Sequence, residues 1–493
     1  MKKNRLYYIA MLLLFHAGNS AAQTPAYNSS KSSLTGIASN YERSCEFMSR
    51  YLVTYSHSTS SSVHHFFTVQ DMHASSPTVK RFPLNIGYEP SGISIQTSIL
   101  YQVNDMRMSD NGVCYFCGSR VTETHTAPIT TESIGFIGFF SINDVLNNTG
   151  TCTILHIVGT GSLSRIEPGG SYEQIFAVGN SDSYSFDPFK STPASLLVGL
   201  EYDYANAQWK YDMVTPISNT EQFTDVVNCG GIIVSSIFLN DNYHIGLRHT
   251  KNGPLRDNLC FNTLSYCNIY DMQTATTPIG TKVAYRKNND HVLMASRGSG
   301  LVTMAHSCYD IAYGIAAYSL YAADIDDARI SQARYTSYPE YVSLSDIATR
   351  SGESKALFLA INNSSNKCHI SQTDWYASGS YFPYYEIAIP NSVLVCRNVE
   401  EFFNSSHSNE YLYLEGYNSS GQPTYFAEKF NFSGIIQSCL PNTISNQFVE
   451  LVTPTFTRDY YPLDYLCKDR IIYSIYTYNI VSTSVTISNT CSH

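Results

Sequence analysis

The sequence predicts an all-β fold: a single β-propeller of seven or eight blades, with about 60 residues in each blade. Three observations lead to this prediction. A short apolar strand recurs at a nearly constant interval along the chain. Most of the remaining sequence consists of β-branched and aromatic stretches bounded by Gly, Asn, Asp, Ser or Pro, which is typical of strands and turns. Long helical patterns are scarce.

The recurring apolar strand has eight copies. They begin at Tyr51, Val113, Gln174, Ile232, His291, Ala356, Tyr411 and Ile471. The intervals lie between 55 and 65 residues, and three or four strands in a unit of this length match one propeller blade. Two or three tandem β-sandwiches are the alternative, because they also contain short strands at even spacing. The absence of a Pro/Gly/Ser linker favours the propeller.

Acidic residues support the same repeat. Asp105, Asp225, Asp346 and Asp464 stand 120, 121 and 118 residues apart, which is twice the unit length. We expect them in polar turns that precede the recurring strand. A closed ring of blades pairs the N- and C-terminal segments in one blade, and the short eighth unit indicates such sharing.

The first residues are typical of a secretory signal. Lys2, Lys3 and Arg5 precede a short apolar run, and the small residues Ser20 to Ala22 suit a signal peptidase. We therefore expect a signal peptide over 1–22, an N-terminal segment over 23–44 that is flexible or contributes a closing strand, and a propeller domain over 45–493. The predicted location is periplasmic, cell-surface-associated or extracellular.

Charge and hydropathy restrict the partners. Without the three cations of the signal, 27 Lys and Arg face 40 Asp and Glu, a charge of −13. Nucleic acid and anionic membranes require a cationic surface, so neither is an expected partner. No apolar stretch reaches the roughly 20 residues that span a bilayer. We expect a monomer.

Thirteen cysteines, an odd number, predict mostly buried free thiols, with several disulfides as the alternative. Cys114 and Cys117 form a C-x-x-C motif within a predicted strand. Side chains three residues apart in a strand point to opposite faces, so a redox pair is not expected there.

One segment resembles a known group of proteins. The run from Val113 to Gly118 (VCYFCG), the run from Gly135 to Phe140 (GFIGFF) and the triplet Ile142-Asn143-Asp144 are similar to secreted β-propeller proteins of the Bacteroidota, a group of unassigned function. The resemblance implies a propeller fold and export, and it carries no catalytic residues.

Motifs for catalysis and metal binding are missing from the sequence. It contains no G-x-S-x-G elbow, no H-E-x-x-H, no second C-x-x-C and no complete dinucleotide loop. We therefore predict no catalytic residue, no metal site and no cofactor. Enzyme activity stays open, since propeller active sites combine residues that are far apart in sequence.

The aromatic composition is the feature that indicates a binding function, because the chain has 39 Tyr and only 2 Trp. Tyr packs its ring while the hydroxyl stays hydrated, which suits sugar faces and peptides, although many of these residues are simply good strand formers. Trp375 and Tyr376 lie with Asp374 in a predicted loop, and Tyr381 follows closely. Loops at one end of a propeller meet near its channel, so these four residues are the predicted binding site.

The expected function is an exported, non-enzymatic protein that binds a glycan or a peptide through such loops. A polysaccharide hydrolase or lyase with acids from several blades is the first alternative, and an envelope scaffold for protein–protein contact is the second. Three or more converging Asp, Glu, His or Arg side chains would favour the enzyme. A channel mouth lined by Tyr and Trp would favour glycan binding.

Overall fold

In the computed structural model of the chain, β-strands form a series of antiparallel sheets. The structure describes residues 39–48, 50–58, 65–71, 79–84, 97–124, 130–169, 174–182, 194–216, 222–228, 232–238, 245–251, 265–269, 275–277, 280–282, 285–286, 292–298, 300–309, 313–321, 329–338, 342–349, 355–362, 367–376, 381–388, 401–403, 410–417, 423–430, 442–452 and 465–484. The expected signal peptide and Asp464 lie outside these residues.

Three five-stranded sheets come first along the chain. Sheet 1 contains β1 (Ser39–Phe47), β2 (Tyr51–Ser58), β3 (His65–Asp71), β4 (Val79–Leu84) and β34 (Thr483–Ser484). Sheet 2 contains β5 (Thr97–Met108), β6 (Val113–Thr124), β7 (Thr130–Ser141), β8 (Thr151–Ile157) and β33 (Ile475–Asn479). Sheet 3 contains β9 (Thr160–Pro168), β10 (Ile175–Ser181), β11 (Ser195–Asp203), β12 (Gln208–Pro216) and β32 (Tyr465–Ile471).

Four further sheets follow. Sheet 4 contains β13 (Gln222–Asn228), β14 (Ile232–Phe238), β15 (Ile245–Lys251) and β16 (Ser265–Ile269). Sheet 5 contains β19 (Tyr285–Arg286), β20 (Leu293–Gly298), β21 (Leu301–Tyr309), β22 (Tyr313–Tyr321) and β23 (Arg329–Tyr338), after a hairpin of β17 (Ala275–Thr277) and β18 (Gly280–Lys282). Sheet 6 contains β24 (Ser343–Thr349), β25 (Lys355–Asn362), β26 (Lys367–Asp374) and β27 (Tyr381–Ala388). Sheet 7 contains β28 (Glu401–Phe403), β29 (Glu410–Tyr417) and β30 (Pro423–Phe430).

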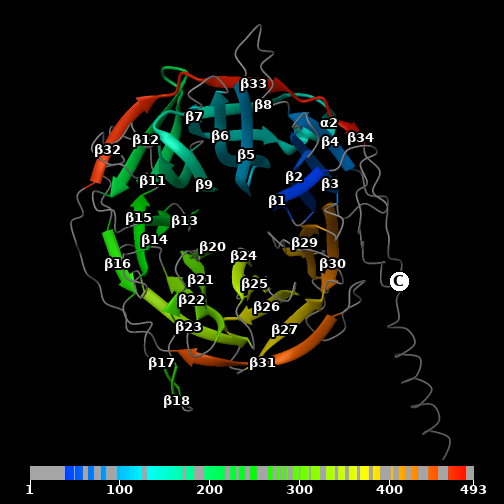
Figure 1. Cartoon of the computed structure of the whole chain (residues 1–493), viewed down its shortest axis with the longest axis vertical. Helices are drawn as coiled ribbons and strands as arrows, with labels where there is room; N and C mark the ends of the chain where they lie inside the picture. The colour runs from blue at the N-terminus through cyan, green and yellow to red at the C-terminus, as the bar shows by residue number, and fades with distance from the viewer. Residues whose placement is uncertain are drawn as a thin grey trace, which may run out of the picture.

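The sheets stand side by side around a common axis and form a ring (Figure 1). Strands β1, β5, β9, β13, β20 and β24 lie nearest the axis in their sheets, and the strands that follow them lie progressively further out (Figure 1). Strands β29 and β30 of the last sheet contact β1 of the first, so the sheets meet where the ring closes. Separate sandwiches, the alternative considered for this sequence, do not describe this arrangement.

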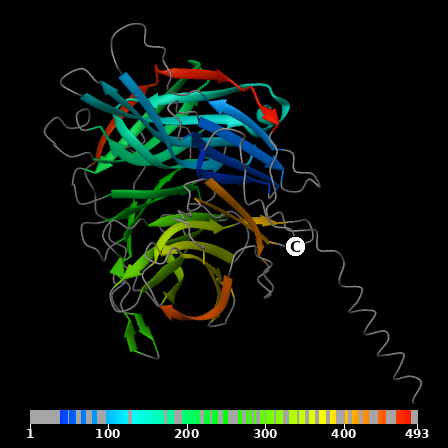
Figure 2. The same cartoon turned by 45° about the vertical axis from the view of Figure 1, so that its right-hand side comes forward.

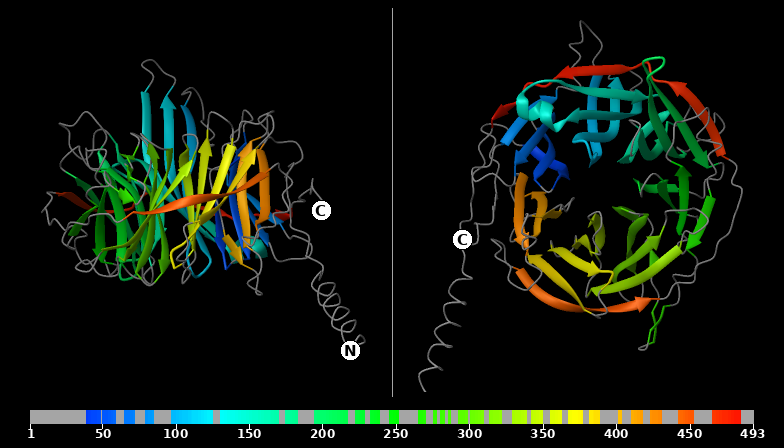
Figure 3. Two further views of the ribbon diagram at one scale, coloured as in Figure 1. Left: turned by 90° about the horizontal axis from the view of Figure 1, so that it is seen from below. Right: turned by 180° about the vertical axis from the view of Figure 1, so that it is seen from behind.

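The C-terminal part of the chain runs around the outside of the ring. β31 (Asn442–Val452) pairs with β27 and then with β23, which joins sheets 5 and 6 into one ten-stranded sheet. β32, β33 and β34 then pair with β12, β8 and β4, the outer strands of sheets 3, 2 and 1. Figures 1 and 2 show these strands in red on the outer rim, and the left view in Figure 3 shows β31 in orange across the outer surface.

The C-terminal segment from β31 to β34, called the tail below, explains how the predicted repeat relates to the sheets. Six of the eight predicted strands fall on the second strand of a sheet: β2, β6, β10, β14, β25 and β29. The strand expected at His291 corresponds to β20, which precedes and pairs with β21 in sheet 5. The eighth, at Ile471, is the end of β32 and belongs to sheet 3. Sheet 1 contains both the N-terminal β1 and the C-terminal β34, so the two ends of the described chain share one sheet.

The hydrophobic core lies between neighbouring sheets. Along β6, Cys114 and Phe116 pack into the cluster between sheets 1 and 2, whereas Tyr115 and Cys117 pack into the cluster between sheets 2 and 3. This alternation follows from the period of two in a strand, and it places the two cysteines of the C-x-x-C motif on opposite faces, as predicted. All four cysteines that the structure assigns are free and buried: Cys45, Cys114, Cys117 and Cys152.

Glycines in sheet 2 make room for aromatic rings. A Cβ on Gly138 would lie 2.2 Å from the ring of Phe116, which packs between sheets 1 and 2. Phe116 contacts Phe67 of sheet 1 in a tilted arrangement, at a centroid distance of 4.8 Å, and Phe140 lies 4.9 Å from the Phe67 ring. Such aromatic pairs contribute about 0.5–1.5 kcal/mol beyond their buried area. Alternate side chains of the VCYFCG and GFIGFF segments therefore pack between sheets 1 and 2, and the others pack between sheets 2 and 3.

Two local features complete the description of sheets 1 and 2. The short run around Val145 forms a one-turn helix, α2 (Ile142–Asn147), which ends at Asn148 in the left-handed conformation with φ 56°. Val145 is fully buried in the cluster between sheets 1 and 2. β1 begins at Ser39, so the innermost strand of sheet 1 starts before the expected domain boundary at residue 45.

We predict that two isoleucines of the tail hold it to the ring. Ile472 and Ile480 are each 4% exposed and pack into the clusters of sheets 2–3 and 1–2. Changing either to Ala should lower the free energy of unfolding by about 2–5 kcal/mol, because each leaves a core cavity. Thermal and urea unfolding measure this. The control Val481→Ala removes a side chain that is 61% exposed and should change stability by less than about 0.5 kcal/mol. Equal effects of all three substitutions would contradict this role of the tail.

Candidate functional site: a charged cluster at the centre of the ring

The innermost strands share a β-bulge at equivalent positions. In β1, β5, β9, β13 and β24, one extra residue interrupts the pairing with the second strand of the sheet. The residues directly after the bulge are Arg43, Asp105, Arg165, Asp225 and Asp346. The first four are 62, 60 and 60 residues apart, and their charges alternate around the ring. A bulge redirects the side chain that follows it, and here it brings charged groups to the centre.

Several of these bulge residues bind the next sheet. Asp105 accepts a hydrogen bond from the backbone N–H of Ile166 in sheet 3, at 3.0 Å. Asp225 accepts one from Met294 N–H in sheet 5, at 2.7 Å. Arg43 donates through Nε to the backbone carbonyl of Asn104 in sheet 2. The expected location of the aspartates in turns before a strand is therefore wrong: Asp105 and Asp225 lie within innermost strands and join neighbouring sheets.

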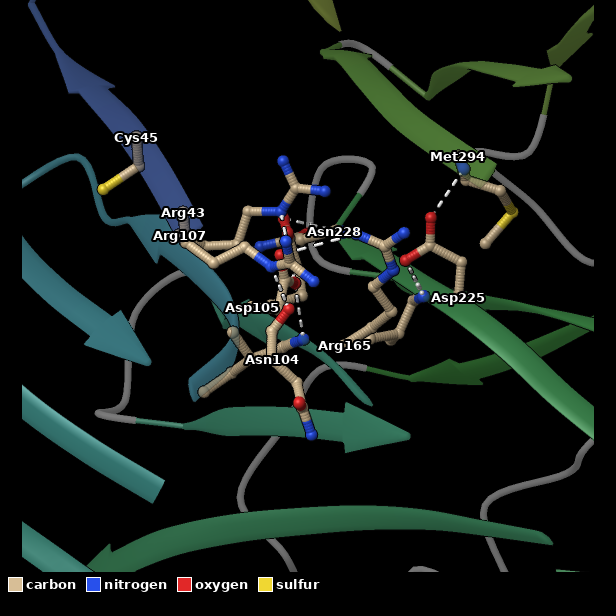
Figure 4. Close-up of polar contacts among 12 residues, drawn as sticks. Arg43, Cys45, Asn104, Asp105, Arg107, Arg165, Asp225, Asn228 and Met294 are labelled. Carbon is tan, nitrogen blue, oxygen red and sulfur yellow. Dashed lines mark hydrogen bonds and ion pairs between the residues drawn. The ribbon is translucent and has the colours of Figure 1, made fainter. Parts of the chain in front are cut away.

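A second pair of charges lies two residues further along the same strands. Arg107 follows Asp105 on β5, and Glu167 follows Arg165 on β9, so each pair points to one side of its strand. Glu167 accepts a hydrogen bond from the backbone N–H of Asn228 in sheet 4, at 3.1 Å. Figure 4 shows the side chains of Arg43, Arg107 and Arg165 gathered around Asp105. Together with Asn104, Asp225, Asn228 and Glu167, these residues are called the central cluster below.

The guanidinium groups and the carboxylates of the cluster differ in their hydrogen bonds. Arg107 Nε lies 3.8 Å from Asp105 Oδ2, and Arg165 Nη1 lies 3.6 Å from Asp105 Oδ1. Within the described residues, neither guanidinium donates a hydrogen bond, and Arg107 Nε is buried without an acceptor. The Arg107 side chain is 28% exposed and that of Arg165 is 15% exposed. By contrast, both oxygens of Asp225 accept backbone N–H groups, from Val226 and Met294.

Burial raises the pKa values of two acids of the cluster, Glu167 and Asp225. Desolvation raises the pKa of Glu167 to about 8, although part of its side chain remains accessible, and the Arg107 charge only partly opposes this shift. Desolvation likewise raises the pKa of Asp225 to about 6, against Arg165 and Arg107. Burial would lower the pKa of Arg107, but Asp105 and Asp225 raise it above its ordinary value. At neutral pH the cluster therefore contains charged arginines, a mostly ionised Asp225 and a mostly protonated Glu167.

Within the described residues, the central cluster has more hydrogen-bond donors than acceptors that they can reach. The carboxylates already accept backbone N–H groups, whereas two arginines retain free N–H donors and Glu167 keeps its acid proton at neutral pH. Arginine presents five donors in a planar fork that matches carboxylate, sulfate and phosphate groups. A ligand that fits this arrangement offers an anionic group rich in acceptors.

The residues predicted from sequence lie elsewhere. Trp375 follows β26 of sheet 6 and is 1% exposed, in the core between sheets 5 and 6. Tyr376 is 74% exposed, and its backbone N–H donates to the Asp374 side chain at 3.0 Å. Tyr381 is in β27. The structure thus brings Asp374, Trp375 and Tyr376 together, but of the two aromatic rings only that of Tyr376 is open to a ligand.

The central cluster was only partly detectable in the sequence. The spacing of Asp105, Asp225 and Asp346 was an available signal, and Arg43 and Arg165 continue it at single-unit intervals. The pairs Asp105–Arg107 and Arg165–Glu167 also stand out in a chain with only 14% charged residues. The alternation of sign between sheets would have indicated a site that spans several sheets.

Neither a metal centre nor a membrane helix is present in the described part of the chain. Its His, Cys, Asp and Glu side chains include no group of three or more that could hold a metal ion. None of its helices is long and apolar enough to cross a membrane.

Comparison with known proteins gives little guidance. No protein family matches the chain, and no curated protein is similar to it. Among solved structures, a variant of prolyl oligopeptidase B from Galerina marginata, bound to a 25mer macrocyclization substrate, aligns with 8% identity and a TM-score of 0.40. The alignment covers 83% of this chain and 51% of that one, so this chain spans about half of its length. A TM-score of this size supports no conclusion about function.

We predict that the carboxylates at the bulges stabilise the ring. Asp225→Ala leaves the buried N–H of Met294 without an acceptor and should lower the free energy of unfolding by about 1–3 kcal/mol. Asp225→Asn retains an oxygen acceptor of the same shape and should lose less than half as much. Urea and thermal unfolding compare the two variants. An alanine variant as stable as wild type would contradict the bond between the sheets.

We also predict that stability falls as the pH rises from 6.5 to 8. The folded-state pKa of Glu167 is above its ordinary 4.5, so the folded state holds this proton more tightly, and its contribution is lost as the pH rises toward about 8. The slope is at most about 1.4 kcal/mol per pH unit for one proton. Asp225, with a pKa near 6, and His156, whose burial lowers its pKa to about 4, titrate mainly below this window.

The variant Glu167→Gln should remove this slope, because the amide does not ionise. The control Glu132→Gln replaces an exposed carboxylate of β7 and should retain it. The melting temperature at closely spaced pH values is the readout. An unchanged slope in Glu167→Gln would show that another group is responsible.

Proposed function

We propose that the chain is a single seven-bladed β-propeller, exported from the cell, that binds a glycan or a peptide without catalysing a reaction. Each of sheets 1 to 7 would be one blade. The ring of sheets and the contact of β29 and β30 with β1 support this reading. The pairing of Ile471 within sheet 3 favours seven blades over eight, because the last repeat adds an outer strand to an existing sheet. Export rests on the N-terminal sequence and on the resemblance of the VCYFCG segment.

The ligand group bound at the centre is a carboxylate or sulfate. The observation that carries this proposal is Arg107: its side chain is 28% exposed near the axis, and its guanidinium donates no hydrogen bond within the described residues. The neighbouring Arg165 and the protonated Glu167 supply further donors. An acidic sugar residue or the C-terminal carboxylate of a peptide offers the matching acceptors. The chain has a net charge of −10, so long polyanions are disfavoured while one anionic group can enter a locally donor-rich site.

Binding should depend on both salt and pH. Charge-assisted hydrogen bonds at a partly exposed site weaken as ionic strength rises. Ionisation of Glu167 would remove a donor and add a negative charge beside the ligand. Affinity for the anionic ligand therefore falls as the pH passes through about 8.

The test compares acidic, sulfated and neutral glycans, and peptides with free or amidated C-termini, on the mature protein. We expect binding only by ligands that carry the anionic group. Arg107→Gln should weaken it about 10- to 100-fold, the loss of one charge-assisted hydrogen bond of about 1.5–3 kcal/mol. Arg120→Gln is the matched control, because Arg120 lies further along β6 and outside the central cluster. Neutral ligands binding equally well, or Arg107→Gln binding as tightly as the control, would overturn the proposal.

A polysaccharide hydrolase or lyase is the second candidate. Glu167 supports it, since an acid that keeps its proton at neutral pH can protonate a leaving group. The central cluster also brings together more than three Asp, Glu and Arg side chains, which is the arrangement expected for an enzyme. Against it, Asp105, Glu167 and Asp225 all accept backbone N–H groups that join or shape the sheets. Release of reducing ends from an acidic polysaccharide, lost in Glu167→Gln, would favour this candidate over a binding protein.

A further inference from the structure

A second group of buried donors lies between sheets 5 and 6, apart from the central cluster. Arg297 comes from β20, Arg334 from β23, and Trp375 follows β26. The Cζ of Arg297 is 5.6 Å from the centroid of the Trp375 ring, and the Cζ of Arg334 is 5.3 Å from it. These three residues, called the tryptophan cluster here, are 2%, 6% and 1% exposed. Two cations are therefore buried around one indole.

The indole face stabilises a cation, but it does not replace a counter-charge. Arg334 donates to neutral oxygens: Thr373 Oγ1 at 2.9 Å and the carbonyls of Asp374 and Trp375 at 2.6 and 3.3 Å. Arg297 donates through Nη2 to the Ser319 hydroxyl, which also accepts from Ser331 at 2.8 Å. No carboxylate pairs with Arg297 among the residues that the structure describes. Burying such a charge without an anion is costly.

Two donors of the tryptophan cluster also lack an acceptor. Arg297 Nε and Trp375 Nε1 are both fully buried, and neither meets a hydrogen-bond acceptor within the described part of the chain. An unsatisfied buried donor costs about 1–3 kcal/mol, and more when the group is charged. The two donors belong to side chains that contact each other, so one acceptor between them could satisfy both.

We propose that the tryptophan cluster binds a small inorganic anion, chloride in the physiological case, between sheets 5 and 6. A monatomic halide suits a site in which all three side chains are almost completely buried. It supplies the negative charge that Arg297 lacks and accepts from Arg297 Nε and Trp375 Nε1. Burial lowers the pKa of Arg297, as expected for a buried cation that no carboxylate of the described residues pairs with. The anion would also join two sheets whose innermost strands contact each other.

The site predicts that chloride stabilises the protein specifically. The melting temperature should rise saturably with chloride when gluconate keeps the ionic strength constant, since a ligand of the folded state stabilises it by mass action. Arg297→Gln should weaken this dependence at least tenfold in chloride concentration, whereas Arg297→Lys, which keeps the charge, should retain part of it. Arg50→Gln is the control, because Arg50 already pairs with Asp71 at 2.7 Å.

A fluorescence measurement keeps the proposal testable if Arg297→Gln does not fold. The chain has two tryptophans, so Trp209→Phe leaves Trp375 as its single reporter. Bromide should quench this emission saturably, and chloride should compete with it. Linear or absent quenching, together with a melting temperature that responds equally to chloride and gluconate, would overturn the proposal. That result would mean that the protein itself supplies the counter-charge.

Discussion

The structure depends on one constraint: no sheet of the ring covers its own two apolar faces. Along β6, alternate side chains go to different neighbours, with Phe116 facing sheet 1 and Cys117 facing sheet 3. Removing one sheet would therefore expose apolar surface on two others. The ring is the arrangement in which every sheet has a neighbour on each side. The tail adds outer strands, and its buried Ile472 and Ile480 fill the same interfaces.

The centre of the ring presents the opposite problem, because innermost strands have N–H groups on an edge that pairs with no further strand. Bulge residues such as Asp105 and Asp225 supply the acceptors. Each of these carboxylates accepts a hydrogen bond from a backbone N–H group of the next sheet. Arginines at alternate positions balance these charges. The same arrangement leaves Arg107 with donors that meet no acceptor among the described residues. A structural solution for the sheet edges thus also creates a place where an anionic ligand can bind.

The sequence was informative where local pattern determines structure. The strands that begin at Val113 and Ala356 were predicted correctly, since the apolar residues in the first part of β6 and of β25 are buried on both faces. Ile471 was assigned to a separate unit, because an outer strand looks the same locally whichever sheet it joins. Its partner β12 lies about 250 residues earlier, a distance that local pattern cannot reveal. Trp375, which follows Asp374 and precedes Gly379 by four residues, resembles an exposed loop residue, yet it is 1% exposed and arginines from two other strands lie against its ring.

The backbone N–H groups of Ile166 and Met294 provide the most direct test of how the sheets are held together. Both lie on innermost strands and are bonded by a carboxylate of the preceding sheet. Residue-resolved hydrogen–deuterium exchange should find these two amides protected as strongly as amides inside the sheets. Exchange as fast as that of an exposed strand edge would show that adjacent sheets are not joined at the centre.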